Sequence, residues 1–133
     1  MKSKSLILVA DDNADCRNLL VWCLERQGFH TISARSGHEA VELALRFQPR
    51  LILMDLNMPG MNGYEATRAI HACGHGRRIP VIAVSTDCVE YGFDRWAFEA
   101  GFTACIAKPW EQDALLEVVT TVLTGVVQSA RAA

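Results

Sequence analysis

Side chains that could act together chemically follow four separate apolar runs of the sequence. They are Asp11 and Asp12 after LILVA (6–10), Asp55 after LILM (51–54), Ser85 after PVIAV (80–84) and Lys108 after ACIA (104–107). The C-terminal ends of parallel strands form one edge of a sheet, where ligand chemistry collects. If all four runs are strands of one sheet, three carboxylates, a hydroxyl and an ammonium group converge there.

Three clustered carboxylates repel one another, and burial would force at least one to keep its proton. A divalent cation removes this conflict, and hard oxygen ligands in a part-hydrated site favour Mg²⁺, which commonly also binds phosphate oxygens. In such a site the Asp55 carboxylate can act as a nucleophile toward phosphorus. The metal and Lys108 would offset charge on the transferred group, and Ser85 could hydrogen-bond one of its oxygens.

The elements that would position these groups follow from the hydrophobic pattern. The four runs and HTISA (30–34) give five strands, and stretches with helical periodicity alternate with them. This alternation predicts an α/β fold with a parallel sheet and helices on both faces. Continuous apolar runs are typical of strands buried on both sides, whereas the alternating run 30–34 suits an edge strand. Ser36 with Glu39, and Asn62-Gly63, predict helix starts.

The composition of the chain limits the number of domains, the classes of partner and the location that are compatible with the sequence. A chain of 133 residues with 50% hydrophobic residues and a net charge of −2 indicates one globular domain without bulk electrostatic attraction for nucleic acid. We expect a domain over residues 1–125 and a loosely tethered tail over 126–133. No signal peptide or membrane-spanning run is evident, and the five cysteines contain no C-x-x-C pair. These features favour a cytoplasmic location without membrane insertion.

The ordered set of motifs LILVADDN, LILMDLNMPGMNGYEATRAI, PVIAVS and AGFTACIAKP covers nearly the whole chain. It resembles the receiver domain of two-component response regulators, of the stand-alone, chemotaxis-regulator-like kind. The resemblance implies a flavodoxin-like, doubly wound sheet of five parallel strands in the order 2-1-3-4-5 with five helices. It also implies a phosphorelay switch whose output is binding rather than enzymatic turnover.

Roles for the candidate residues also come with this resemblance. Asp55 matches the phosphoacceptor, and Asp11 and Asp12 match the acidic pair that holds Mg²⁺ with it. Asn57 matches the position whose backbone carbonyl ligates the metal. Ser85 and Lys108 match the hydroxyl and the ammonium group that contact the phosphoryl group. The phosphodonor would be a phosphohistidine on a sensor histidine kinase or a histidine phosphotransfer protein.

Alternatives remain for several of these assignments. Asp11, Asp12 or Asn13 could cap the helix that follows, and Thr86 could replace Ser85 as the phosphate contact. The chain could be a phosphorylation-independent adaptor with a receiver fold. It could also be a phosphohydrolase working through an aspartyl-phosphate, although Asn57 lacks the carboxylate that such enzymes use near the nucleophile for acid–base work.

The chain departs from the family pattern in two places. Cys105 stands where receivers usually carry an aromatic ring three residues before Lys-Pro, so coupling between that ring and the hydroxyl is in doubt; a redox role for Cys105 is an alternative. The segment CVEYGFDRWAF (88–98) is rich in aromatic residues. We expect the 88–110 face, with Trp96 and Trp110, to bind an unknown downstream protein or a second copy of the chain. Ordinary packing of the aromatic residues is an equal alternative.

Overall fold

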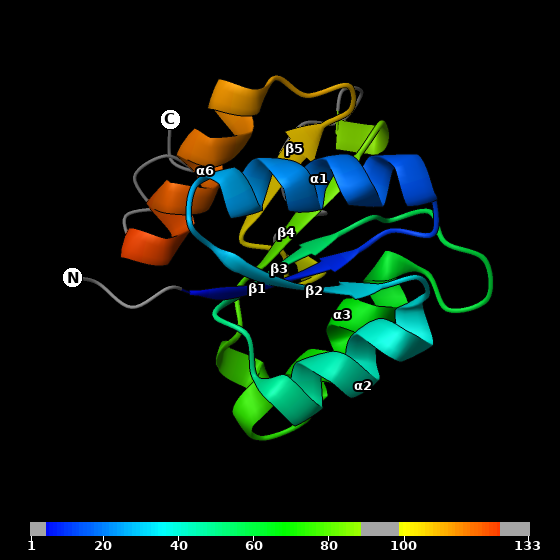
Figure 1. Ribbon diagram of the computed structural model, residues 1–133. Coiled ribbons are helices and arrows are strands. Elements are labelled where there is room, and N and C mark those ends of the chain that lie inside the picture. Colours follow the sequence, from blue (N-terminus) through cyan, green and yellow to red (C-terminus); the bar gives the residue numbers. More distant parts are fainter. Residues whose placement is uncertain (1–4, 89–98, 126–133) are drawn as a thin grey trace.

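The computed structural model describes residues 5–88 and 99–125. Strands and helices alternate along this part of the chain (Figure 1). The elements are β1 (Leu6–Ala10), α1 (Ala14–Arg26), β2 (His30–Ala34), α2 (Gly37–Phe47), β3 (Leu51–Met54), α3 (Gly63–Ala72), the 3₁₀ helix η1 (His75–Arg78), β4 (Val81–Ser85), β5 (Ala104–Ala107) and α6 (Gln112–Thr124).

The sheet confirms the predicted topology. Its five parallel strands lie in the order β2-β1-β3-β4-β5, which makes β2 an edge strand as its alternating sequence predicted. Four strands have the predicted bounds, whereas β4 begins one residue later, at Val81, and includes Ser85. Pro80 has no N–H to donate to the ladder. Its carbonyl still accepts a hydrogen bond of 3.0 Å from the backbone N–H of Ile52.

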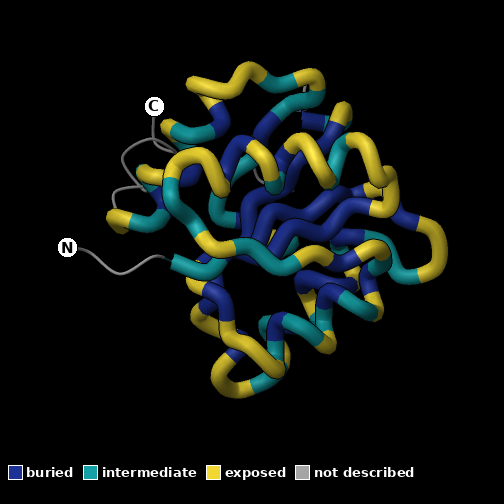
Figure 2. The backbone as a smooth tube through the Cα atoms, viewed as in Figure 1, coloured by how far each residue is buried: buried dark blue, intermediate teal, exposed yellow. Residues whose placement is uncertain are grey.

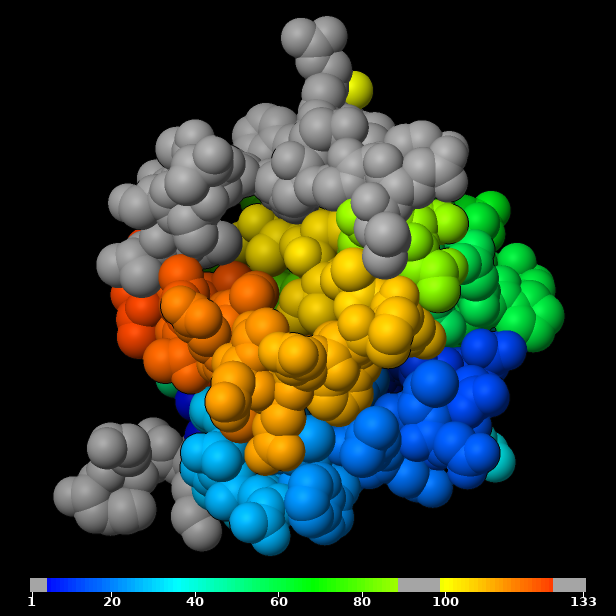
Figure 3. Space-filling model, turned by 90° about the horizontal axis from the view of Figure 1, so that it is seen from above, coloured from blue at the N-terminus to red at the C-terminus, as the bar shows by residue number. Residues whose placement is uncertain are grey.

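Helices cover both faces of the sheet, α1 and α6 on one and α2 and α3 on the other (Figure 1). Successive strand residues point to opposite faces, so each strand contributes to two cores. Leu8 and Ile52 pack in the α2–α3 core, and Ile7 and Leu53 pack in the α1–α6 core. Figure 2 shows buried strands enclosed by helices whose outer surfaces are exposed. Figure 3 looks onto the α1–α6 layer, where atoms of the two helices lie side by side.

Side-chain caps fix where the helices begin. Asn13 Oδ1 accepts a 2.9 Å hydrogen bond from the Cys16 N–H at the start of α1. Asn62 and Glu65 form a reciprocal capping box at the start of α3. Because Asn13 caps α1, Asp11 and Asp12 are not needed for that purpose.

The predicted number of helices is five, and residues 5–88 and 99–125 contain four α-helices and one 3₁₀ helix. The aromatic-rich segment 88–98, expected to form part of a binding face, lies outside the described residues except for Cys88, and the expected tail over 126–133 lies outside them entirely. Within the described chain, no helix is both long enough and apolar enough to cross a membrane.

Candidate functional site

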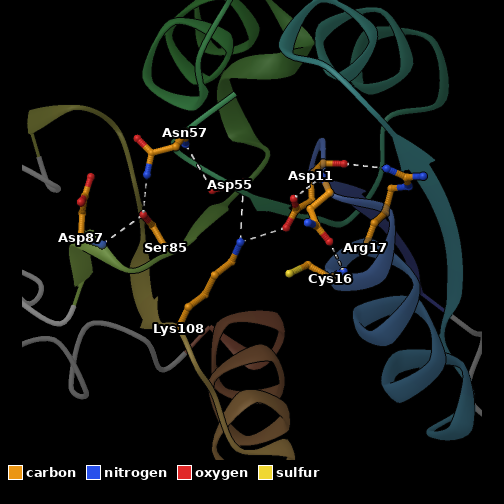
Figure 4. A network of polar contacts seen from close by, with 9 residues as sticks. Asp11, Cys16, Arg17, Asp55, Asn57, Ser85, Asp87 and Lys108 are labelled. Atoms are coloured by element: carbon orange, nitrogen blue, oxygen red, sulfur yellow. Dashed lines mark hydrogen bonds and ion pairs between the residues drawn. The ribbon is translucent and has the colours of Figure 1, made fainter. Parts of the chain in front are cut away.

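Two buried carboxylates leave neighbouring strands at the same edge of the sheet. Asp11 directly follows β1 and Asp55 directly follows β3, and they are 1% and 6% exposed. The Asp11 N–H donates to the carbonyl of Ala34 at 3.1 Å, and the Asp55 N–H donates to the carbonyl of Ala10 at 2.9 Å. These bonds continue the ladder beyond the strands and hold both side chains at the edge (Figure 4).

Asp12 completes an acidic cluster. One carboxylate oxygen from each of Asp11, Asp12 and Asp55 lies within 4.8 Å of the others, and Asp12 is the exposed member. Carboxylate oxygens of this number and spacing, open to solvent on one side, fit a hexacoordinate Mg²⁺ that keeps some of its waters. The donor set therefore fits the predicted metal. The backbone carbonyl of Asn57, predicted as a further ligand, stays a prediction.

Lys108, which directly follows β5, reaches both buried carboxylates. Its Nζ lies 3.1 Å from Asp11 Oδ2 and 3.6 Å from Asp55 Oδ2 (Figure 4). Burial would lower the pKa of Lys108, but the hydrogen bond to Asp11 and the charges of Asp55 and Asp11 outweigh it, and the pKa is raised. Lys108 is therefore a fixed positive charge beside the cluster.

The charge of Lys108 does not hold the pKa of Asp55 at its ordinary value. Burial, followed by the charge of Asp11, raises the pKa of Asp55 to about 6, although the Asn57 N–H and Lys108 act in the opposite direction. The Asn57 N–H donates to Asp55 Oδ1 at 3.2 Å. A cation bound between the carboxylates would favour the ionised form of Asp55, which is the nucleophilic one.

Ser85 lies on the side of the site away from Asp11. Its buried Oγ accepts hydrogen bonds from Asn57 Nδ2 at 3.4 Å and from the Asp87 N–H at 3.2 Å (Figure 4). Thr86, the alternative hydroxyl, is exposed. The structure thus brings together Asp11, Asp12, Asp55, Asn57, Ser85 and Lys108, which are the residues that the sequence assigned to the phosphoacceptor site.

Two further residues support the site and were not anticipated. Arg17, in the first turns of α1, donates from Nη1 to the backbone carbonyl of Asp11 at 2.8 Å. Gly63 begins α3 so close to β3 that a Cβ there would overlap the carbonyl oxygen of Asp55 and lie 2.9 Å from Leu56 Cα. The Asn62-Gly63 turn signal was visible in the sequence, but this close approach depends on how α3 docks.

A disulfide joins Cys88 and Cys105, with 6.0 Å between their Cα atoms. Cys105, which takes the place of the usual aromatic ring, is therefore half of a disulfide and not a free thiol. The two residues are 17 positions apart, so the sequence contains no C-x-x-C spacing that would indicate the disulfide. The parallel register explains it: Cys105 on β5 lies opposite Ala83 on β4, and the chain turns back toward it after Ser85.

Comparisons with known proteins agree with this geometry. The family model described as "Response regulator receiver domain" matches residues 7–120. Protein PilH of Pseudomonas aeruginosa is 35% identical over 120 residues, which are 90% of this chain and 98% of that protein. The polar-differentiation response regulator DivK of Brucella ovis is 34% identical over 121 residues, which are 91% of this chain and 97% of that protein.

A solved structure is similar in fold and sequence. It is the receiver domain of the sensor histidine kinase PA1611 from Pseudomonas aeruginosa, described with a magnesium ion coordinated in its active site cleft. The TM-score is 0.84 at 30% sequence identity, and the match covers 92% of this chain and all of that one (100%).

Proposed function

The chain belongs to the response regulator receiver domain family, and from this membership we propose that it is a phosphorylation-dependent switch in which Asp55 accepts a phosphoryl group. The observation that carries the proposal is the buried Asp55 carboxylate, held at the sheet edge with Asp11, Asp12 and the Lys108 ammonium group. This arrangement combines a carboxylate nucleophile with an ammonium group and with an acidic cluster that fits Mg²⁺, and these two cations would face the phosphoryl group.

The reaction is a transfer from nitrogen to oxygen. An oxygen of Asp55 attacks the phosphorus of a phosphohistidine, the new O–P bond forms, the N–P bond breaks, and the imidazole leaves with the bond's electron pair. Mg²⁺, held by Asp11, Asp12, Asp55 and the carbonyl of Asn57, would supply positive charge against the phosphoryl oxygens. Lys108 stays ionised and offsets the added negative charge of the acyl phosphate.

Ser85 supplies the hydroxyl for one phosphoryl oxygen. In the structure its Oγ accepts hydrogen bonds from Asn57 Nδ2 and the Asp87 N–H, and its own O–H can donate to a phosphoryl oxygen on Asp55. The new charge at Asp55 thereby shifts the equilibrium between two arrangements of the segment after β4. The output is then a change in binding at the 88–110 face, whose residues 89–98 lie outside the described part of the chain.

Receiver domains are generally signalling switches rather than enzymes, and Asn57 supports the same assignment here. A phosphohydrolase of this kind needs a second acid–base group near the nucleophile. The side-chain amide of Asn57 donates a hydrogen bond to Ser85 Oγ, and an amide cannot act as the general acid or base of a hydrolase. We propose a cytoplasmic protein with a sensor histidine kinase or histidine phosphotransfer protein as donor, an unknown protein as target and no direct contact with nucleic acid.

Incubation with Mg²⁺ and acetyl phosphate, followed by intact-protein mass spectrometry, tests the proposal. Wild type should gain one phosphoryl group, and Asp55→Asn should gain none. Asp12→Asn is the matched control, because it removes a metal ligand and keeps the nucleophile, and it should label more slowly than wild type. Equal labelling of wild type and Asp55→Asn would overturn the assignment.

A further inference from the structure

The disulfide between Cys88 and Cys105 spans the two segments that carry Ser85 and Lys108. Cys88 comes three residues after Ser85, and Cys105 comes three residues before Lys108. We propose that this cysteine pair is a reversible thiol–disulfide modification site whose oxidation restrains the Ser85–Lys108 side of the phosphoacceptor site. The inference rests on the proposed phosphorylation of Asp55 and adds a second input to it.

Several contacts connect the disulfide to the site. The Asp87 N–H donates to Ser85 Oγ at 3.2 Å, and Cys88 is the next residue along the chain. The Lys108 N–H donates to the carbonyl of Ser85 at 3.1 Å. The disulfide therefore ties the chain three residues after β4 to β5, and the backbone bond ties the end of β4 to the residue that follows β5.

The two cysteines differ in access, which sets the order of the chemistry. Cys88 is buried, with 6% of its surface exposed, whereas Cys105 is partly exposed on the edge strand β5. An oxidant that suits this chemistry is a low-molecular-weight disulfide of the glutathione class, which reacts by thiol–disulfide exchange. The Cys105 thiolate attacks one of its sulfurs, the small S–S bond breaks, and one small thiolate leaves.

The second step closes the protein disulfide. The Cys88 thiolate attacks the Cys105 sulfur of the mixed disulfide and releases the second small thiolate. In total the two cysteines lose two protons and two electrons, and the small disulfide becomes two thiols. Reduction by excess small thiol reverses both steps. In the disulfide form Cys88 Sγ lies 3.9 Å from the carbonyl oxygen of Ala83, which can accept a hydrogen bond from the thiol once the disulfide is reduced.

Oxidation of the cysteine pair should favour the unphosphorylated arrangement of the site, which is the one seen in the structure. In this arrangement Ser85 Oγ is bonded to Asn57 and Asp87, and Lys108 Nζ is closer to Asp11 than to Asp55. A phosphoryl group on Asp55 must be accommodated beside Lys108 Nζ, which lies 3.6 Å from Asp55 Oδ2, so the segments that carry Ser85 and Lys108 must shift to make room for it. The disulfide fixes the chain three residues beyond Ser85 to β5, so it opposes that movement. Reduction removes this constraint.

The test compares two forms of the same wild-type protein. One sample is oxidised with glutathione disulfide and the other is reduced, and small reagents are then removed. Peptide mass spectrometry after alkylation verifies the Cys88–Cys105 linkage. Both samples are then mixed with Mg²⁺ and acetyl phosphate. The reduced form should acquire phosphate at least about fivefold faster, because more of it can adopt the arrangement that accepts the phosphoryl group. Fivefold is the lower end of the range that is typical of coupling between two sites of one protein.

Variants separate the pair from the other thiols. Cys88→Ser/Cys105→Ser should label like reduced wild type under both conditions, and Cys73→Ser should keep the full redox response because Cys73 is a free cysteine. Absence of the Cys88–Cys105 linkage after oxidation, or equal labelling rates of the two wild-type forms, would overturn this inference. If neither form labels, the proposed phosphoacceptor function fails instead.

Discussion

Replacing Asp55 by Asn should stabilise the protein at neutral pH when no divalent cation is present. The pKa of Asp55 is raised from 3.8 to about 6 in the folded protein. Each pKa unit corresponds to about 1.4 kcal/mol, so ionised Asp55 destabilises the folded state by up to about 3 kcal/mol. Asn removes this charge and keeps an Oδ1 that can accept the hydrogen bond from the Asn57 N–H.

The sign of this effect depends on pH. Below the unfolded pKa of 3.8, Asp55 is protonated in both states, and its ionisation contributes nothing to the difference. As the pH rises through 3.8 toward 6, the unfolded chain releases the proton first, and wild type loses stability relative to Asp55→Asn. Above about pH 7 the difference reaches its full value.

Urea unfolding of both proteins in a chelator, at about pH 7.5 and about pH 4, measures the difference. Asp12→Asn is the matched control: it removes an exposed carboxylate of the same cluster and should change the free energy of unfolding by less than about 0.5 kcal/mol. Adding Mg²⁺ should stabilise wild type and reduce the advantage of Asp55→Asn. If Asp55→Asn is no more stable than wild type at neutral pH in chelator, the electrostatic account of the site is wrong.

Three other substitutions test how the site is held, each by urea unfolding. Lys108→Met should cost about 2 kcal/mol near neutral pH, because it removes a charge-assisted hydrogen bond to Asp11, and an unchanged free energy of unfolding would contradict this reason. Gly63→Ala should cost about 1–3 kcal/mol through overlap with the Asp55 backbone; Gly74→Ala, where a Cβ meets nothing within 4 Å, should be nearly neutral, and equal losses would exclude the overlap. Asn62→Ala should cost about 1 kcal/mol by removing the cap of α3, whereas an unchanged stability would show that the cap is dispensable.

Strand positions could be read from the sequence because of how the sheet is buried. Strands β1, β3 and β4 contribute to cores on both faces, so they appear as unbroken apolar runs whose ends are sharp. The polar residue that follows each run then marks the C-terminal end of the strand, and these ends together form the edge of the sheet that carries the site. This reasoning placed Asp11, Asp55 and Ser85 correctly at the sheet edge, whereas β4 was placed one residue early because Pro80 had been counted in it.

Features that depend on docking and register could not be read in this way. The disulfide requires both the pairing of β4 with β5 and the path of the chain after Ser85, and neither leaves a local spacing signal. The contact of Arg17 with the Asp11 carbonyl requires the orientation of α1 over the sheet edge. The raised pKa of Asp55 arises from burial and from charges brought from distant parts of the sequence.

The central claim is that Asp55, and no other carboxylate of the cluster, carries the phosphoryl group. The most direct measurement labels wild type with acetyl phosphate and Mg²⁺, reduces the acyl phosphate with borohydride and maps the modified residue by peptide mass spectrometry. Borohydride converts a phosphorylated aspartate to homoserine, so the account predicts this change at position 55 alone. Conversion at Asp11 or Asp12, or no conversion anywhere in the chain, would contradict it.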